Sequence, residues 1–192
     1  MKPAEKIFLL LAAIGFSLKI LMIFGGGVLL TLSLSALAIY YFLSFAFLND
    51  IPFGKMFHAG SYKEISRKRI IGTIGLGFAL SCISIGTLFF LQFWPGGTIN
   101  IGLGLFLLAI AVIVALNRYS ETRSVFYKKI FLRAFVFGGI GIIALFTPAM
   151  KLFELFHRNN PAYIEATRKY WADPGNDSLW KDVQKLRESD KK

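Results

Sequence analysis

The sequence predicts an all-α fold: a polytopic helical membrane protein with about five transmembrane helices and a short helical C-terminal tail. Hydrophobic residues occupy 55% of the 192 positions and charged residues only 17%, whereas a soluble domain carries about 25% charged residues. The apolar residues form blocks of membrane-span length. Glycine-rich turns or basic loops separate these blocks, which predicts helices that cross the bilayer in alternating directions.

The first block, residues 7–48, is almost continuously apolar and is long enough for two spans of about 20 residues each. Gly25-Gly26-Gly27 interrupts it, and glycine readily adopts the positive φ of a tight turn. We therefore expect spans at residues 7–24 and 28–48. The N-terminal apolar run exceeds a signal peptide's 7–15-residue core and has no A-x-A-like cleavage site, so we interpret it as a retained span.

The remaining blocks predict three more spans, and a change of character then marks the tail. The spans are expected at residues 70–93, 99–117 and 130–150, with the turn Trp94-Pro95-Gly96-Gly97 between the first two. A transmembrane domain thus covers residues 1–150, and an amphipathic polar tail covers residues 151–192.

Two basic loops, residues 49–69 and 118–129, predict the orientation. Lys and Arg collect in cytoplasmic loops of membrane proteins, so we expect both loops and the N-terminus in the cytoplasm, in a bacterial inner membrane. Five crossings place the tail on the opposite side. If residues 130–150 are re-entrant or lie at the interface, the tail returns to the cytoplasm.

The net charge of +11 invites a comparison with nucleic-acid-binding proteins. Thirteen of the 22 Lys and Arg precede Lys151, and most of these lie in the two basic loops. Membrane orientation explains this distribution. We therefore predict a lipid bilayer as a partner, together with a protein partner or a homo-oligomer, and no nucleic acid.

An internal similarity relates the two predicted hairpins. A constant offset of 71 aligns Gly15 with Gly86 and Gly25-Gly26 with Gly96-Gly97. Each hairpin reads as span, glycine turn, span and basic loop, so a duplication would be a parallel repeat and not the inverted kind common in transporters. Two unrelated glycine-turn hairpins would also align in this way.

The tail contains two amphipathic segments. Asn160-Pro161 resembles a helix N-cap followed by proline at the first helical position, which predicts a helix over about 161–172. A second helix is expected over about 178–188. Because such short helices form no stable core alone, their aromatic residues are candidates for docking a partner: Tyr163, Tyr170, Trp171 and Trp180.

Four residues in the membrane domain are candidate functional residues: Lys19, Gln92, Trp94 and Arg133. Lys19 is the one charge well inside a predicted span, and burying a charge there costs about 2.5–3.5 kcal/mol. It can snorkel to the surface, bond locally or hold an anionic substrate. Arg133 is interpreted as an interfacial anchor, Gln92 as a residue that supports the turn, and Trp94, Tyr40 and Tyr41 as members of an aromatic belt.

The chemistry-bearing residues do not assemble into a recognisable catalytic or metal-binding pattern. His58 and His157 lie in different polar segments, without carboxylates or thiols at metal-ligand spacing. Cys82, the one cysteine, lies in an apolar block. We therefore predict no catalytic residues, no metal and no cofactor.

Residues Leu88-Phe89-Phe90-Leu91-Gln92-Phe93-Trp94-Pro95-Gly96-Gly97 resemble the membrane hairpin of the GldL-like proteins, the gliding-motility and type IX secretion inner-membrane family. In the first hairpin, Lys19 falls where that family has a lysine. The resemblance implies a similar hairpin and a bacterial origin. Phe93 replaces the family's histidine, and neither second span has its intramembrane glutamate, so a proton-driven motor role does not transfer.

Two functions remain in view. The first is a non-enzymatic integral membrane protein that acts as an accessory or scaffold subunit of a membrane complex, which the small-residue helix faces and the aromatic tail favour. The second is a small transporter or channel for an anionic or small solute, which Lys19 and the parallel hairpins favour.

Overall fold

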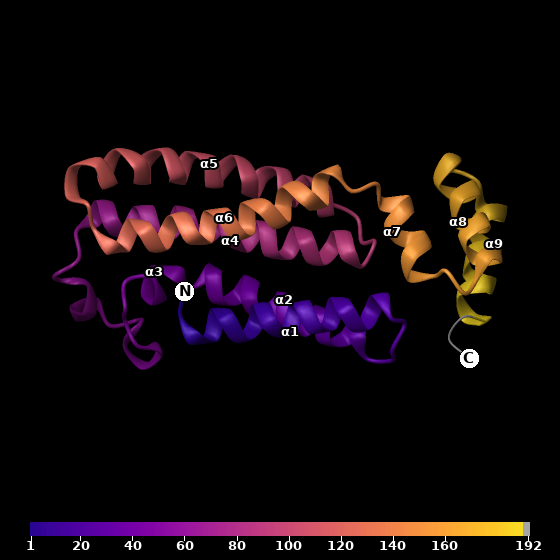
Figure 1. The fold of residues 1–192 in the computed structure, drawn as a ribbon, viewed down its shortest axis with the longest axis horizontal. Helices are drawn as coiled ribbons and strands as arrows, with labels where there is room; N and C mark the ends of the chain where they lie inside the picture. The colour runs from indigo at the N-terminus through magenta and orange to yellow at the C-terminus, as the bar shows by residue number, and fades with distance from the viewer. Residues whose placement is uncertain (190–192) are drawn as a thin grey trace.

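The computed structural model describes residues 1–189, and this part of the chain is helical without strands (Figure 1). Its α-helices are α1 (Pro3–Ile20), α2 (Gly26–Phe42), α3 (Ser44–Phe47), α4 (Arg67–Leu91), α5 (Gly97–Thr122), α6 (Val125–Phe146), α7 (Ala149–Phe156), α8 (Pro161–Ala172) and α9 (Asp177–Ser189). Two short 3₁₀ helices, Phe53–Lys55 and Ala59–Tyr62, lie in the loop before α4.

Five long helices, α1, α2, α4, α5 and α6, lie side by side and alternate in direction (Figure 1). At one end lie the N-terminus, the α3–α4 loop and the junction between α5 and α6; we call this the basic end. At the other end, the turn end, lie the α1–α2 and α4–α5 turns and the tail helices.

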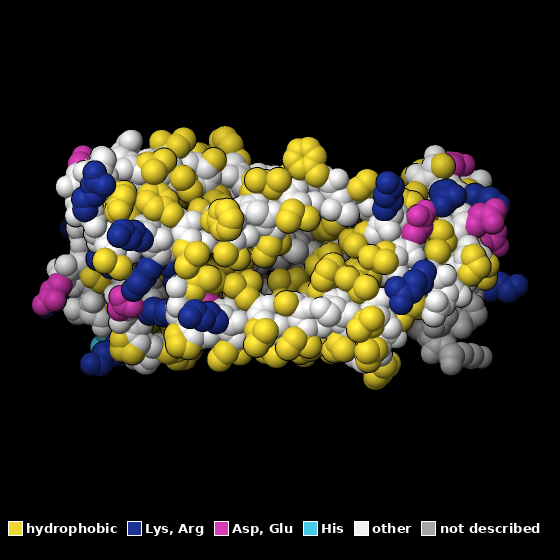
Figure 2. Space-filling view, viewed as in Figure 1, with side chains coloured by type: hydrophobic (Ala, Val, Ile, Leu, Met, Phe, Trp, Pro, Cys, Tyr) yellow, Lys and Arg dark blue, Asp and Glu magenta, His cyan; other side chains and the backbone are white. Residues whose placement is uncertain are grey.

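Three of these helices, α4, α5 and α6, are long and apolar enough to cross a membrane, and α2 is a shorter apolar helix. The chain is therefore a helical protein with membrane-spanning character. Hydrophobic side chains cover the middle of the bundle, whereas Lys and Arg side chains gather towards its ends (Figure 2). Five crossings remain a prediction, because α2 is short and α1 carries charged residues near both of its ends.

The helix boundaries differ from the predicted spans because capping residues, and not hydropathy alone, determine where helices begin and end. α1 begins at Pro3, four residues before the predicted span, since proline suits the first helical turn. Ser66 and Ser124 cap α4 and α6, so both helices begin in the basic loops. α5 likewise extends to Thr122, five residues beyond the predicted end.

The α1–α2 and α4–α5 turns have the same backbone structure. In each, the last turn of the first helix ends in a Schellman motif, with a left-handed residue after the helix: Met22 and Phe93 both have φ +56°. Ile23 N donates to Leu18 O at 2.9 Å, and Trp94 N donates to Phe89 O at 2.8 Å. These bonds satisfy carbonyls that a helix C-terminus otherwise leaves unpaired.

Glycines repeat at equivalent positions of the two hairpins, where the helices approach closely. A Cβ added to Gly15 would lie 2.6 Å from Leu30 N, and one added to Gly86 would lie 2.7 Å from Ile101 N. At the turns, Gly25 and Gly96 have φ values of +86° and +84°. Each of these positions therefore requires glycine for a stated steric reason.

Small residues also join the two hairpins through α2 and α4. A Cβ on Gly77 would overlap the Ser44 side chain, and the Ser81 hydroxyl donates to Ala38 O at 2.9 Å. The expected small-residue face thus packs within the chain. Tyr40 and Tyr41 are buried in this core, so their interpretation as aromatic-belt residues was wrong.

The tail folds back on the turn end of the bundle. α7 contacts α1, and Phe156 packs edge-on against Phe16. Asn160 caps α8 by accepting a hydrogen bond from Tyr163 N, and the observed bounds of α8 match the predicted 161–172. α9 packs against α8 and lies across the bundle axis with it (Figure 1).

Candidate functional site

A buried ion pair links α1 to α6 near the basic end. Arg133 Nη2 donates to Glu5 Oε1 at 2.6 Å, and Arg133 Nε donates to the same oxygen at 3.2 Å. Glu5 Oε2 accepts from Lys2 N, and Arg133 Nη1 donates to Lys129 O. The Arg133 and Glu5 side chains are only 4% and 0% exposed. Each charge is therefore compensated and hydrogen-bonded, as burial requires.

This pair corrects two sequence-based interpretations. Arg133 is not an interfacial anchor, because it lies inside the bundle. The first span was also expected to begin at residue 7, but α1 begins early enough to bury Glu5 in its first turn. An acid in the first turn of a helix is favoured by the helix dipole, so the position of Glu5 suits the start of α1.

Lys19 forms a second polar link between helices, at the turn end; we call this link and the Glu5–Arg133 pair the two cross-links. Its ammonium group donates to Leu91 O at 2.6 Å and to Gln92 Oε1 at 2.9 Å. Leu91 is the last residue of α4, whose C-terminal carbonyls carry partial negative charge. The ammonium also lies 4.7 Å from the centre of the Phe156 ring, a cation–π contact with α7.

Gln92 extends this cross-link to α2. Its amide nitrogen donates to Gly27 O at 3.1 Å and to Thr31 Oγ1 at 2.8 Å. Lys19 and Gln92 therefore join both hairpins and α7 through side chains. Trp94 takes no part: it is 49% exposed and packs edge-on against Phe89.

The structure thus brings Lys19 and Gln92 together but places Arg133 and Trp94 elsewhere. The two cross-links hold the bundle at opposite ends and engage each of their charged groups with protein partners. In chemical terms they can fix helix positions. Among the described residues, no group of three His, Cys, Asp or Glu side chains could hold a metal ion.

A polar cavity of about 240 Å³ adjoins the Glu5–Arg133 pair at the basic end. Four basic side chains and one acid contribute to its lining: Lys2, Arg69, Lys129, Arg133 and Asp50. Lys2 forms an ion pair with Asp50 at 3.0 Å. The remaining excess of positive charge gives this cavity the character of an anion site.

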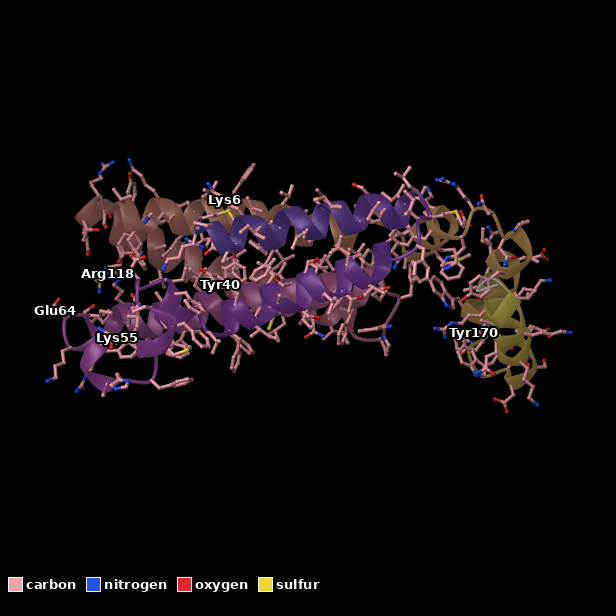
Figure 3. The ribbon with its side chains drawn as sticks, turned by 90° about the horizontal axis from the view of Figure 1, so that it is seen from below. Lys6, Tyr40, Lys55, Glu64, Arg118 and Tyr170 are labelled. Atoms are coloured by element: carbon pink, nitrogen blue, oxygen red, sulfur yellow. The ribbon has the colours of Figure 1, made fainter. Side chains whose placement is uncertain are left out.

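The aromatic candidates of the tail separate into a core and a surface. Tyr163 is buried against Phe153 and Val183, so it belongs to the tail's own core and is removed from the docking set. Trp171 is 38% exposed and also contacts Phe93 and Phe153. Trp180, 40% exposed, stacks obliquely on Tyr170, which Figure 3 labels at the turn end.

An exposed ion pair lies beside this aromatic surface on α8. Lys169 Nζ lies 2.9 Å from Glu165 Oε1. Their hydrogen bond lowers the pKa of Glu165 and raises the pKa of Lys169. Both groups are exposed to solvent, so the pair adds little to stability.

Two of the most informative features were absent from the sequence-based candidates. Glu5 fell outside the predicted spans because hydropathy alone placed the start of the first span at residue 7. The signal that could have identified it was Pro3, which marks a first helical turn with an acid at its third position. The basic cavity combines loops and helices that are distant in sequence, so no local pattern predicted it.

Comparisons with known proteins add no relationship to this geometry. No family model matches the chain, and neither a curated protein nor a solved structure shows significant similarity to it.

Proposed function

We propose that this protein is a non-enzymatic accessory or scaffold subunit of a membrane complex, and that the α8–α9 hairpin docks its protein partner. The observation that carries the proposal is the position of this hairpin. It lies across the turn end of the bundle and exposes Trp180 beside Tyr170 (Figures 1 and 3). Tryptophan and tyrosine are enriched where protein interfaces form.

The cross-links of the bundle support a structural role. The side chains of Lys19 and Arg133 join helices of the same chain. A transporter that used Lys19 to hold a substrate would need the ammonium group to exchange these protein bonds for the substrate. A scaffold needs only that the bonds persist.

Affinity purification from native membranes in mild detergent tests the docking proposal. We expect a defined partner to co-purify with the full chain and with the control variant Trp94→Ala, which removes an exposed tryptophan at the same end. Trp180→Ala combined with Tyr170→Ala should lose the partner while the protein still elutes as a folded species. A full chain that elutes alone and monodisperse overturns the proposal.

We further propose that the basic end faces the cytoplasm and the tail faces the opposite side of a bacterial inner membrane. Basic residues of both loops support this orientation; Lys55 and Arg118 are labelled at this end in Figure 3. Cys82 is buried, so a Cys82→Ala background allows single new thiols to be placed.

Gly60 and Gly175 suit this purpose, because nothing lies within 4 Å of a Cβ added at either position. A membrane-impermeant maleimide applied to spheroplasts should label Gly175→Cys, and should label Gly60→Cys only after lysis. Labelling of both thiols from one side would mean that the tail returns and would overturn the five-crossing topology.

We also interpret the two hairpins as a parallel repeat whose turn is shared with the GldL-like membrane hairpin. The matching Schellman turns and close-approach glycines support this interpretation at the backbone level. The hairpins differ where the polar cross-link forms, since Phe90 stands in place of Lys19 and Leu21 in place of Gln92 at the offset of 71.

The second candidate function is a small transporter or channel for an anionic solute, which the basic cavity beside Arg133 favours. Liposomes that contain the purified protein should then take up radiolabelled phosphate. Lys129→Gln removes one charge from the lining of the cavity and should reduce this uptake. Equal uptake by Lys129→Gln and by Lys128→Gln, a neighbour outside the lining, would exclude the cavity as the site.

A further inference from the structure

A large apolar groove lies between α4 and α5 at the basic end, with the start of α6 as its floor. Its volume is about 640 Å³, within the range of ligand sites. Gly72 and Gly75 line it, and an added Cβ at either glycine would meet no atom within 4 Å. These glycines therefore leave space that helix packing does not use.

Along α4, the length of the groove corresponds to one leaflet of a bilayer. Along α4 its lining runs from Ser66 to Leu76, which is about 15 Å at 1.5 Å per residue. This is half of a hydrocarbon core of about 30 Å. A single acyl chain that enters from the leaflet at the basic end would therefore follow the groove to its inner limit.

Positive charge surrounds the mouth of the groove and nowhere else along its lining. Lys68 and Arg69 lie in the first turn of α4, and Arg118 lies in the last turns of α5. Arg69 is held in place, because its Nε donates to Asn49 Oδ1 at 2.9 Å and its guanidinium stacks 4.1 Å above the Phe126 ring. No acidic residue lines the groove.

We propose that this groove binds an anionic glycerophospholipid, with one acyl chain between α4 and α5 and the phosphate at Lys68, Arg69 and Arg118. The charge distribution determines the occupant: Arg118 pairs with Glu121 at 3.0 Å, but an apolar helix in the groove would leave Lys68 and Arg69 at the mouth without an anion. A zwitterionic lipid would place a second positive group among them. Anionic lipids are also abundant in the cytoplasmic leaflet, which is the leaflet at the basic end in the orientation proposed above.

Binding can be measured on the full chain by native mass spectrometry, with phosphatidylglycerol as the probe and phosphatidylcholine of the same acyl chains as the comparison. We expect phosphatidylglycerol to remain bound as a discrete adduct and to raise the melting temperature in detergent. Phosphatidylcholine should do neither at the same concentration.

Two pairs of variants separate a built site from general attraction to the basic end. Gly75→Leu fills the groove, whereas Gly102→Leu, whose added Cβ also meets nothing within 4 Å, changes a position outside the lining. Lys68→Gln with Arg118→Gln removes two charges at the mouth, whereas Lys63→Gln with Lys128→Gln removes two exposed charges that do not line it.

Gly75→Leu and the mouth variant should each weaken phosphatidylglycerol binding about tenfold or more, and both controls should bind as the original chain does. If a control variant loses as much phosphatidylglycerol binding as the groove or mouth variant with which it is matched, bulk charge or surface area attracts the lipid. That result would overturn the proposal. Equal binding of phosphatidylcholine, or a polypeptide that remains in the groove after purification, would overturn it as well.

Discussion

Glu5 of α1 and Arg133 of α6 are 128 positions apart in the sequence, yet they form an ion pair with two hydrogen bonds. Both side chains are buried. Breaking a buried pair leaves one uncompensated charge in the bundle, which costs about 3–5 kcal/mol. We therefore expect Glu5→Gln to lower the melting temperature in detergent strongly.

The double variant Glu5→Gln with Arg133→Met removes both charges and should recover part of this loss. The exposed pair Arg118–Glu121 is a suitable control, because Glu121→Gln should change stability by less than about 1 kcal/mol. A melting temperature unchanged by Glu5→Gln would mean that the pair does not stabilise the folded protein.

The Lys19–Gln92 contact predicts energetic coupling between the two hairpins. Lys19→Met removes the cation that pairs with Leu91 O and Gln92 Oε1. Gln92→Leu removes the acceptor and the bonds to α2. Because both residues belong to one network, the double variant should lose less stability than the two single losses combined, by about 0.5–3 kcal/mol in thermal melts. Additive losses would show that the residues act independently.

Gly77 and Gly75 differ by two positions in α4 but should respond in opposite ways to alanine. A Cβ at Gly77 overlaps Ser44 and approaches the Tyr41 carbonyl, so Gly77→Ala must force α4 away from α2. We expect it to be strongly destabilising. Gly75→Ala meets open space and gains helix propensity, about 0.5–1 kcal/mol in favour of the helix. The ratio of folded to aggregated protein after heating measures both effects.

Met22 and Phe93 occupy equivalent left-handed positions but should also differ. Relief of the left-handed strain makes Met22→Gly stabilising by about 1 kcal/mol. Phe93→Gly relieves the same strain but removes ring contacts with Phe153 and Phe156. It should therefore be destabilising, because lost packing exceeds relieved strain. Parallel thermal melts of the two variants test this contrast, which two stabilising substitutions would contradict.

The helical membrane fold and the tail were predictable because they depend on local properties. Long apolar blocks specified α4, α5 and α6, and Asn160-Pro161 specified where α8 begins. Hydropathy was less reliable at the helix ends, since it does not register the capping bonds of Ser66 and Ser124. It placed α1 four residues too late for the same reason, and this error concealed Glu5.

By itself, the sequence determined the element types, the two glycine turns and the separation of basic from apolar segments, because each follows from neighbours within a few residues. Only the tertiary structure decided that Glu5 meets Arg133, that Lys19 meets Gln92, that Tyr163 is buried and that three cations surround one groove. These relationships depend on how helices rotate about their axes and pack. A small rotation or a slide of one helix would separate Glu5 from Arg133 and Lys19 from Gln92. No local pattern in the chain specifies the helix positions that bring them together.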